Sequence, residues 1–181
     1  MGTLRRVVTA TDAAGKSLIE SDGAPPNIVT PPSGGGLSWA DLWVVPAVPT
    51  DVDSSGDQAP GLMNIDPAPG GISWKRVTIA PRSRQAEIDM SGFVDEVREL
   101  APGMQTGGEH DPEIPGRHRT ASVDLLTVLE GEVWLELDSG EVCIRAGDFL
   151  VQRGTWHGWN NRSDDDCVVA VVMISTKSPD A

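Results

Sequence analysis

Three histidines are the strongest candidates for chemistry in this chain: His110, His118 and His157. An imidazole moves protons readily near neutral pH, and it is also the commonest nitrogen ligand for metal ions in proteins. Two of the three lie near features with meaningful spacing. Asp124 follows His118 by six residues, and His157 follows Gly154 by three residues. These positions predict either a proton-transfer site or a divalent metal site.

The spacing between His118 and Asp124 requires the chain to change direction. Alternate residues of a strand share one face, so His118, Thr120 and Asp124 would point the same way. A straight strand, however, would put Asp124 roughly 20 Å from His118. We therefore predict a bend or bulge near residues 120–123, although no Gly or Pro marks it. With that bend, His118, Asp124 and His157 would form a two-imidazole, one-carboxylate set that suits Fe(II), Mn(II) or Zn(II).

The same side chains are catalytic candidates without a metal. A carboxylate beside an imidazole fixes the tautomer of the ring and raises its basicity, which prepares a general base. His110 and Asp111 are the candidates for a further metal ligand, but a solvated loop is the simpler interpretation of these two residues.

Four more residues are predicted to contact a substrate. Trp159 would share the face of His157 in a strand, and ordinary core packing is the equal alternative for both tryptophans. An arginine fork suits a substrate carboxylate, although a rim charge is usually only solvated. The predicted contact residues are Thr120, Arg153, Trp156 and Trp159.

Residues 118–175 form the most regular stretch of the chain. Runs rich in β-forming residues alternate with tight turns, and Val133, Leu135 and Leu137 indicate one buried strand face. Strands this short and evenly spaced predict an antiparallel sandwich or a small barrel. The predicted strands are Leu125–Leu129, Val133–Leu137, Val142–Ile144, Phe149–Val151 and Cys167–Ile174.

The first half of the chain predicts short strands separated by Pro- and Gly-containing breakers. One helix is predicted, with Ser91 as its cap and Pro102-Gly103 at its end. A loop is predicted over residues 105–117. The predicted strands here are Arg5–Ala10 and Ser17–Glu20, which would form a hairpin, followed by Leu37–Val45 and Ile72–Ile79.

Residues 115–175 resemble the paired motifs of the cupin superfamily, which are small β-barrels of the jelly-roll type. In the first motif, Asp124 stands where metal-binding cupins have Glu, and Thr120 stands where they have a second His. In the second motif the family's Pro is absent, and Gln152-Arg153 precedes the glycine. The matching residues are His118 and Gly131 in the first motif, and Gly147, Gly154, His157 and Asn161 in the second.

The resemblance implies an all-β fold, a cupin double-stranded β-helix (jelly-roll) barrel with a strand-rich N-terminal extension and one short helix. We expect the extension over residues 1–99, the barrel over residues 100–176 and a disordered tail over residues 177–181. It also implies a homodimer. Because the first motif of this chain is incomplete, the resemblance implies a cupin barrel more strongly than it implies a bound metal ion. The expected cofactor is therefore either a divalent metal (Fe, Mn, Ni or Zn) or none.

Two functions follow from the resemblance. The first is an enzyme of the oxygenase, decarboxylase or isomerase type that acts on a small organic acid or a polyketide-like aromatic molecule, using His118, Asp124 and His157. The second is a non-catalytic sensor or carrier with a degenerate metal site. The fold does not choose between these reaction classes.

The composition of the chain excludes several other classes of protein. The 181 residues include 27 acidic and 14 basic side chains, which give a net charge of −13. Such a polyanion is not expected to bind nucleic acid or an anionic membrane. No apolar run is long enough for a transmembrane helix and no secretory signal is recognisable, so a cytoplasmic protein is expected. Cys143 and Cys167 lie in apolar runs and are expected to be reduced and structural.

Overall fold

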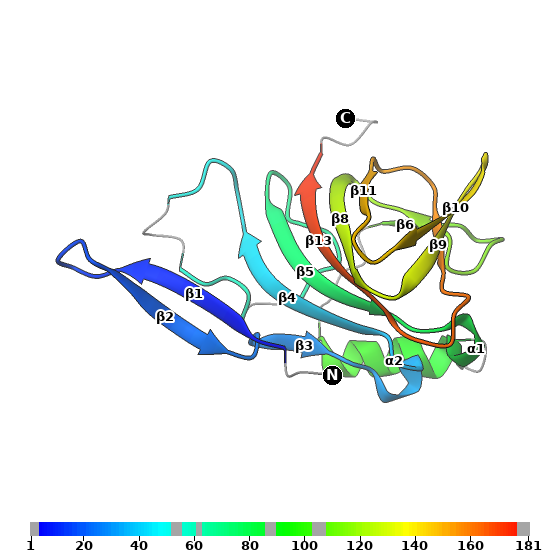
Figure 1. Cartoon of the computed structure of the whole chain (residues 1–181), viewed down its shortest axis with the longest axis horizontal. Coiled ribbons are helices and arrows are strands. Elements are labelled where there is room, and N and C mark those ends of the chain that lie inside the picture. Colours follow the sequence, from blue (N-terminus) through cyan, green and yellow to red (C-terminus); the bar gives the residue numbers. More distant parts are fainter. Residues whose placement is uncertain (1–3, 52–55, 61–62, 86–89, 103–107, 177–181) are drawn as a thin grey trace.

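A computed structural model describes residues 4–51, 56–60, 63–85, 90–102 and 108–176. Strands dominate these residues, and the helices are short (Figure 1). No helix in the described ranges is long and apolar enough to cross a membrane.

The largest element is a six-stranded antiparallel sheet that joins both halves of the chain. Its central pair is β5 with β13, so a strand from the predicted extension lies beside the last strand of the predicted barrel (Figure 1). The division of the chain at residues 99 and 100 stays a prediction. In spatial order the strands are β11 (Phe149–Gln152), β8 (Ser122–Glu130), β13 (Cys167–Ser175), β5 (Ile72–Ile79), β4 (Ser38–Val45) and β3 (Asn27–Val29).

A three-stranded sheet packs against the large one. It contains β10 (Gly140–Arg145), β9 (Glu132–Leu137) and β12 (Gly158–Asn160) in that order. Apolar side chains from both sheets bury one another, which stabilises the sandwich by removing apolar surface from water. The core residues are Ile79, Leu126, Val128, Val133, Ile144, Cys167, Val169, Val171 and Met173.

Two small ribbons complete the strands. β1 (Arg6–Thr11) and β2 (Ser17–Gly23) form the predicted hairpin, which projects away from the rest of the molecule (Figure 1). β6 (Glu109–His110) pairs with β7 (His118–Arg119). This second ribbon corrects the prediction of a continuous loop over residues 105–117, because its strands are too short to show any periodicity in the sequence.

The predicted helix is present as α2 (Met90–Leu100), which begins one residue before the expected cap. The backbone N–H of Ser33, in the 3-10 turn η1 (Pro32–Gly34), donates to Glu96 on α2. A second helix, α1 (Arg82–Gln85), was not predicted, because four residues are too few for a helical hydrophobic pattern. The predicted strands and the all-β class are confirmed, and both cysteines are free thiols.

Candidate functional site

His118 and His157 lie side by side in the structure. Their backbones form an isolated antiparallel bridge, in which each N–H donates to the other residue's carbonyl at 2.9 Å. Directly opposed residues of an antiparallel pair place their side chains on the same face. The imidazole ring centroids are accordingly 4.4 Å apart, with the ring planes at 52°. Two segments that are far apart in sequence therefore bring their histidines together.

The third histidine extends this pair into a row. His110 on β6 is opposite His118 on β7, and their rings stack with centroids 5.8 Å apart. The chain's histidines thus occupy neighbouring positions on three adjacent segments. The predicted alternative for His110, a solvated loop, is only partly right, because this exposed residue belongs to a strand.

Both rings of the central pair are held in one tautomer. His118 Nδ1 lies 3.0 Å from the Gly116 carbonyl oxygen, and His157 Nδ1 lies 2.9 Å from the Thr155 carbonyl oxygen. A carbonyl oxygen only accepts hydrogen bonds, so a neutral ring must carry its proton on Nδ1. Each Nε2 therefore keeps its lone pair available for a substrate proton or a metal ion.

The environment keeps these imidazoles neutral at pH 7. Burial lowers the pKa of His157 to about 4, against a smaller opposing effect of its hydrogen bond to Thr155, and the nearby His118 lowers it further. Burial also lowers the pKa of His118, although its hydrogen bond to Gly116 and the charge of Asp66 favour protonation. His118 is half-buried and His157 is buried. His118 is therefore the better proton acceptor of the two.

The predicted change of direction after His118 is present. Strand β7 ends at Arg119 and β8 begins at Ser122, so the chain bends between them. Gly154, from the second predicted motif, packs against this bend with φ of +59°. A Cβ atom at Gly154 would lie 2.8 Å from the Thr120 carbonyl oxygen. The glycine therefore allows the two motif segments to approach each other closely.

Asp124 has a buried carboxylate that belongs to a polar line along β8. Ser122 Oγ donates to Asp124 Oδ1 at 2.6 Å and lies 2.9 Å from the Thr120 hydroxyl. Burial raises the pKa of Asp124 to about 6, the bond from Ser122 opposes this, and the charge of Asp66 adds to the increase. Asp124 can therefore hold or release a proton near neutral pH.

The metal set predicted from His118, Asp124 and His157 does not meet in the structure. Within the described ranges, no three His, Cys, Asp or Glu side chains are arranged to hold a metal ion. The two Nε2 atoms have the chemistry of metal ligands, but Asp124 does not complete their set. Three protein ligands are usual in catalytic zinc sites, so the arrangement does not fit a complete metal centre.

Asp66 is a residue of this region that the sequence did not reveal. Its Oδ1 atom is buried and has no hydrogen-bond partner among the residues that the structure describes. Burial raises its pKa, while the nearby charges of His118, Lys75 and His110 lower it, in that order. Asp66 lies in an irregular segment, where no periodicity indicates which way a side chain points, and the only local signal is the Pro67 that follows it.

The predicted substrate-contact residues separate into different environments. Trp159 makes an edge contact with the His157 ring at 5.3 Å and also packs on the core. Trp156 instead lies 5.4 Å from the guanidinium of Arg117 and 5.2 Å from that of Arg119. Arg153 is exposed, and Thr120 is buried in the bend before β8, where its hydroxyl is hydrogen-bonded to Ser122. The structure thus brings Trp159, but not Trp156, to the histidine pair.

Residues 98–174 match the family of cupin domains. This stretch of the chain is a cupin domain. The expected family resemblance and the jelly-roll fold class are confirmed.

The cupin domain has curated relatives in fungi. Oryzines biosynthesis cluster protein J of Aspergillus oryzae is 35% identical over 108 residues, which cover 55% of this chain and 59% of that protein. Cupin-domain-containing oxidoreductase srdB of Neurospora crassa is 49% identical over 76 residues, which cover 41% of this chain and 34% of that protein. The chain therefore spans less than two thirds of either relative. Among solved structures, a Cnp3 cupin domain from Schizosaccharomyces pombe has a TM-score of 0.45 and 7% identity, covering 96% of this chain and 89% of that one.

A buried ion pair lies beside the cupin core. Lys75 on β5 and Asp41 on β4 face each other and are both almost completely buried. Asn27 also donates to Asp41, at 3.4 Å. Asp41 offsets part of the charge of Lys75, which also lowers the pKa of Asp66.

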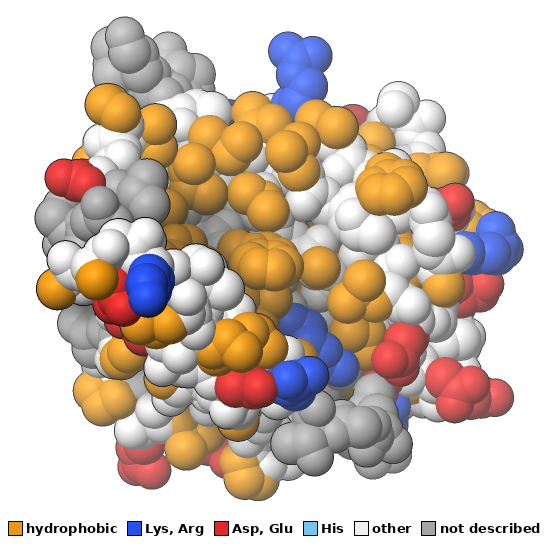
Figure 2. Space-filling model, turned by 60° about the vertical axis from the view of Figure 1, so that its left-hand side comes forward, with side chains coloured by type: hydrophobic (Ala, Val, Ile, Leu, Met, Phe, Trp, Pro, Cys, Tyr) orange, Lys and Arg blue, Asp and Glu red, His pale blue; other side chains and the backbone are white. Residues whose placement is uncertain are grey.

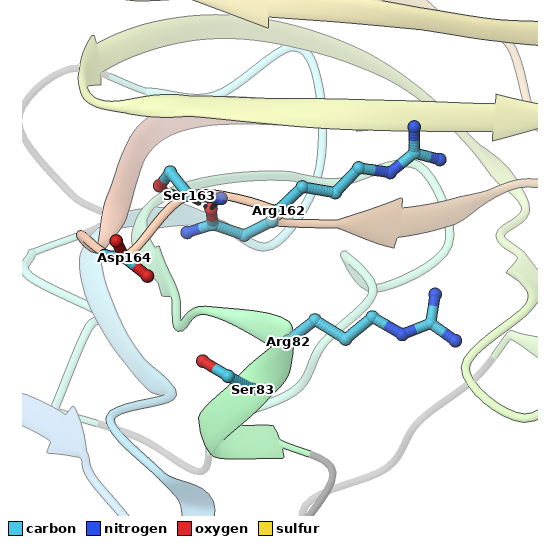
Figure 3. Close-up of a pocket in the computed structure, with 6 residues that line it drawn as sticks. Arg82, Ser83, Arg162, Ser163 and Asp164 are labelled. Carbon is cyan, nitrogen blue, oxygen red and sulfur yellow. Dashed lines mark hydrogen bonds between the residues drawn. The ribbon is translucent and has the colours of Figure 1, made fainter.

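A surface pocket of about 390 Å³ lies elsewhere on the molecule (Figure 3). Asn161, the last residue of the second cupin motif, lines it and donates to the Ile79 and Asp165 carbonyls at 2.9 and 2.8 Å. Asn161 therefore has a structural role, because it connects the end of β5 to the segment before β13. The pocket contains none of the three histidines; its lining residues are Arg82, Ser83, Asn161, Arg162, Ser163 and Asp164.

Proposed function

We propose that the protein is an enzyme that binds a small organic molecule against the His118–His157 pair and transfers a proton through these imidazoles. The observation that carries the proposal is the pair itself. Two neutral rings lie 4.4 Å apart, and carbonyl partners on Nδ1 leave both Nε2 atoms available. Geometry of this kind is the first requirement for general acid–base catalysis.

The two histidines have different roles because their environments differ. His118 accepts the substrate proton, since the charge of Asp66 stabilises its imidazolium form. His157 stays neutral and accepts a hydrogen bond from a substrate hydroxyl at Nε2, because its deep burial opposes protonation. Groups whose pKa values are pushed apart by their surroundings commonly divide acid–base work in this way.

The charges around the pair favour a neutral substrate. The charge of Asp66 acts on His118, and the charge of the nearest lysine, Lys75, is offset in part by its buried partner Asp41. A substrate carboxylate would be repelled there, whereas a phenol or enol hydroxyl would be bound by the available acceptors. Of the two substrate classes expected from the sequence, we therefore propose the polyketide-like aromatic.

Isomerisation is the reaction class that this geometry supports best. A proton leaves one substrate atom for His118 Nε2 and returns to another, so no further reactant is needed. The oxidoreductase and biosynthesis-cluster names of the fungal relatives support a catalytic role. Oxygenation and decarboxylation stay predictions of the family resemblance, and no step here passes through a metal.

Non-catalytic binding is the second candidate function. It is favoured by Thr120, which occupies the place of a second motif histidine, and by the weak basicity of His157. In that case the same aromatic ligand would bind without any proton exchange.

An aromatic hydroxyketone, ortho-hydroxyacetophenone, distinguishes these candidates. Exchange of its methyl protons in D₂O is followed by NMR, and its binding is followed by thermal shift. We expect protein-dependent exchange that falls about a hundredfold in His118→Gln, as is usual for loss of a general base. His110→Gln is the matched control and should retain exchange. Binding without exchange would favour the carrier. The absence of both binding and exchange would contradict the proposal.

A further inference from the structure

The inner face of the six-stranded sheet is polar at the end where β5 and β8 begin. Ser73 on β5 is opposite Met173 on β13, and Met173 is opposite Asp124 on β8. Directly opposed residues share a face, and Met173 belongs to the core, so all three side chains point inward. Lys75, two residues after Ser73, shares this face. The strands therefore direct an acid, a hydroxyl and an ammonium group towards the inside of the barrel.

This arrangement inverts the usual order of a sheet that packs against a core. Trp74 lies between the two buried polar residues of β5 and is 45% exposed, and Leu125, beside the buried Asp124, is also 45% exposed. Hydrophobic side chains gather on the surface of the molecule in the broad group that Figure 2 shows. Burying polar groups while apolar ones stay in water opposes folding, so the pattern indicates a functional requirement.

The hydroxyl group of Ser73 is buried and is not satisfied by the protein. The residue is 3% exposed, and its Oγ atom has no hydrogen-bond partner among the residues that the structure describes. Leaving such a group unpaired is unfavourable. A serine hydroxyl both donates and accepts, so Ser73 offers two kinds of hydrogen bond to a molecule that reaches it.

Asp66 provides a second unsatisfied group close to this strand. Its Oδ1 atom is buried and likewise lacks a hydrogen-bond partner within the described ranges. A turn over residues 68–71 joins the Asp66 segment to β5, so the two lie at the same end of the sheet. Burial raises the pKa of Asp66, and the charges of His118 and Lys75 oppose this effect. Because electrostatic effects weaken with distance, the carboxylate lies near both residues.

Lys75 has hydrogen-bond donors beyond the one used in its ion pair. Its Nζ donates to Asp41 Oδ1, which is the acceptor that it contacts among the described residues. An ammonium group has three N–H donors, so further donors remain. Donors on Lys75, an acceptor on Asp66 and the hydroxyl of Ser73 are thus gathered at one end of the inner face.

We propose that Ser73, Lys75 and Asp66 form a subsite that binds a second hydroxyl group of the ligand, apart from the one at the histidine pair. A hydroxyl donates to the carboxylate and accepts from the ammonium or the serine, so it satisfies both kinds of group. A ligand carboxylate would leave Asp66 unpaired, and an alkyl group would satisfy neither. The subsite therefore selects a polyhydroxylated aromatic molecule. This inference rests on the proposed function, because it assigns the far end of the same ligand.

Met173 suits the ring of such a ligand. It lies between Ser73 and Asp124 on the inner face, one strand from each. Neighbouring strands are about 4.8 Å apart, so a ring over Met173 brings its substituents within reach of the groups on both sides. A thioether side chain also packs favourably against aromatic rings. These surroundings fit an aromatic skeleton with a hydroxyl at its far end.

Two matched ligands test the subsite by calorimetry on the full chain. The probe is ortho,para-dihydroxyacetophenone, and its comparison is the analogue with a methyl group in place of the para hydroxyl. We expect the wild type to bind the dihydroxy ligand at least about tenfold more tightly, since a hydroxyl-binding site rejects an analogue that leaves its buried polar groups unpaired. Equal affinities in the wild type would overturn the subsite and leave the proposed function standing.

Ser73→Ala removes one partner of the second hydroxyl. It should weaken binding of the dihydroxy ligand about tenfold and leave the affinity for the methyl analogue unchanged. Ser38→Ala is the matched control, because Ser38 on β4 is opposite Thr78 and so lies on the other face of the sheet. The control should bind both ligands as the wild type does. Unchanged binding in Ser73→Ala, or an equal loss in Ser38→Ala, would overturn the subsite.

The stability of the ligand-free protein gives a readout that does not depend on the probe. Because the Ser73 hydroxyl is unpaired within the described structure, Ser73→Ala should have a urea midpoint at or above that of the wild type. A lower midpoint would show that the hydroxyl serves the fold, directly or through a buried water, and would overturn the subsite. Failure of both ligands to bind would overturn the proposed function together with the subsite, whereas loss of the preference alone overturns only the subsite.

Discussion

The imidazoles of His118 and His157 lie 4.4 Å apart, and the backbones of the same two residues exchange a pair of 2.9 Å hydrogen bonds. The side-chain pair is therefore fixed by the main chain and does not depend on loop packing alone. The carbonyls of Gly116 and Thr155 orient the two rings in the same way, each two residues before its histidine. Rigid placement of this kind is what a catalytic or binding pair needs.

The protonation of His157 is directly measurable. Its pKa of about 4 lies below the ordinary value near 6.5, so between these pH values the ring is protonated in the unfolded chain but neutral in the folded protein. The resulting stability is present above pH 6.5 and is lost as the pH falls towards 4, by about 3 kcal/mol. NMR titration of the ring should show an inflection near 4 in the folded protein and near 6.5 in urea. An inflection above 6 in the folded protein would contradict the burial argument.

Asp124 should have the opposite effect on stability. Its pKa of about 6 lies above the ordinary value of 3.8, so the folded state binds a proton more tightly than the unfolded chain does. The resulting contribution to the free energy of unfolding is present below pH 3.8 and is lost as the pH rises through 6. Asp124→Asn keeps an acceptor for Ser122 and removes the charge. We expect urea unfolding to show the variant more stable than wild type by about 2 to 3 kcal/mol at pH 7 and equal to it at pH 4. A difference in unfolding free energy between the variant and the wild type that does not change with pH would contradict this account.

Gly154→Ala tests the contact between the two motif segments. The added Cβ would meet the Thr120 carbonyl at 2.8 Å, and φ of +59° is unfavourable for alanine. We expect a loss of about 2 to 4 kcal/mol in urea unfolding, since clash and backbone strain add. Gly70→Ala is the control, because Gly70 has a similar φ of +77° with nothing within 4 Å of an added Cβ. Equal losses in both variants would show that the close approach is unimportant.

Metal content follows from the arrangement of donors. Because Asp124 does not join the two imidazoles, we expect protein purified without chelator to retain less than about a tenth of an equivalent of Fe, Mn, Ni or Zn, as expected when a ligand is missing. Elemental analysis of the wild type and of His157→Ala measures this. Near-stoichiometric metal that disappears in His157→Ala would make the pair a metal site and would contradict the metal-free proton transfer.

Much of the barrel was predictable from the sequence because its signals are local. Alternation in residues 133–137 marked a strand with one buried face, and glycines marked the turns between strands. The bend after His118 was predicted from strand geometry alone. Motif spacing also indicated that His118 and His157 belong together, although their roles and those of Asp124, Arg153 and Trp156 stay predictions, as do the cytoplasmic location and the homodimer.

Only the tertiary structure decided which distant groups surround that pair. The two-residue strand that places His110 beside His118, the approach of Asp66 and the pairing of β5 with β13 all depend on contacts between segments far apart in the chain. Such contacts follow from strand register and from the path of irregular segments. Residue type and periodicity describe only the faces of single elements, so they determine what a strand buries but not what it meets.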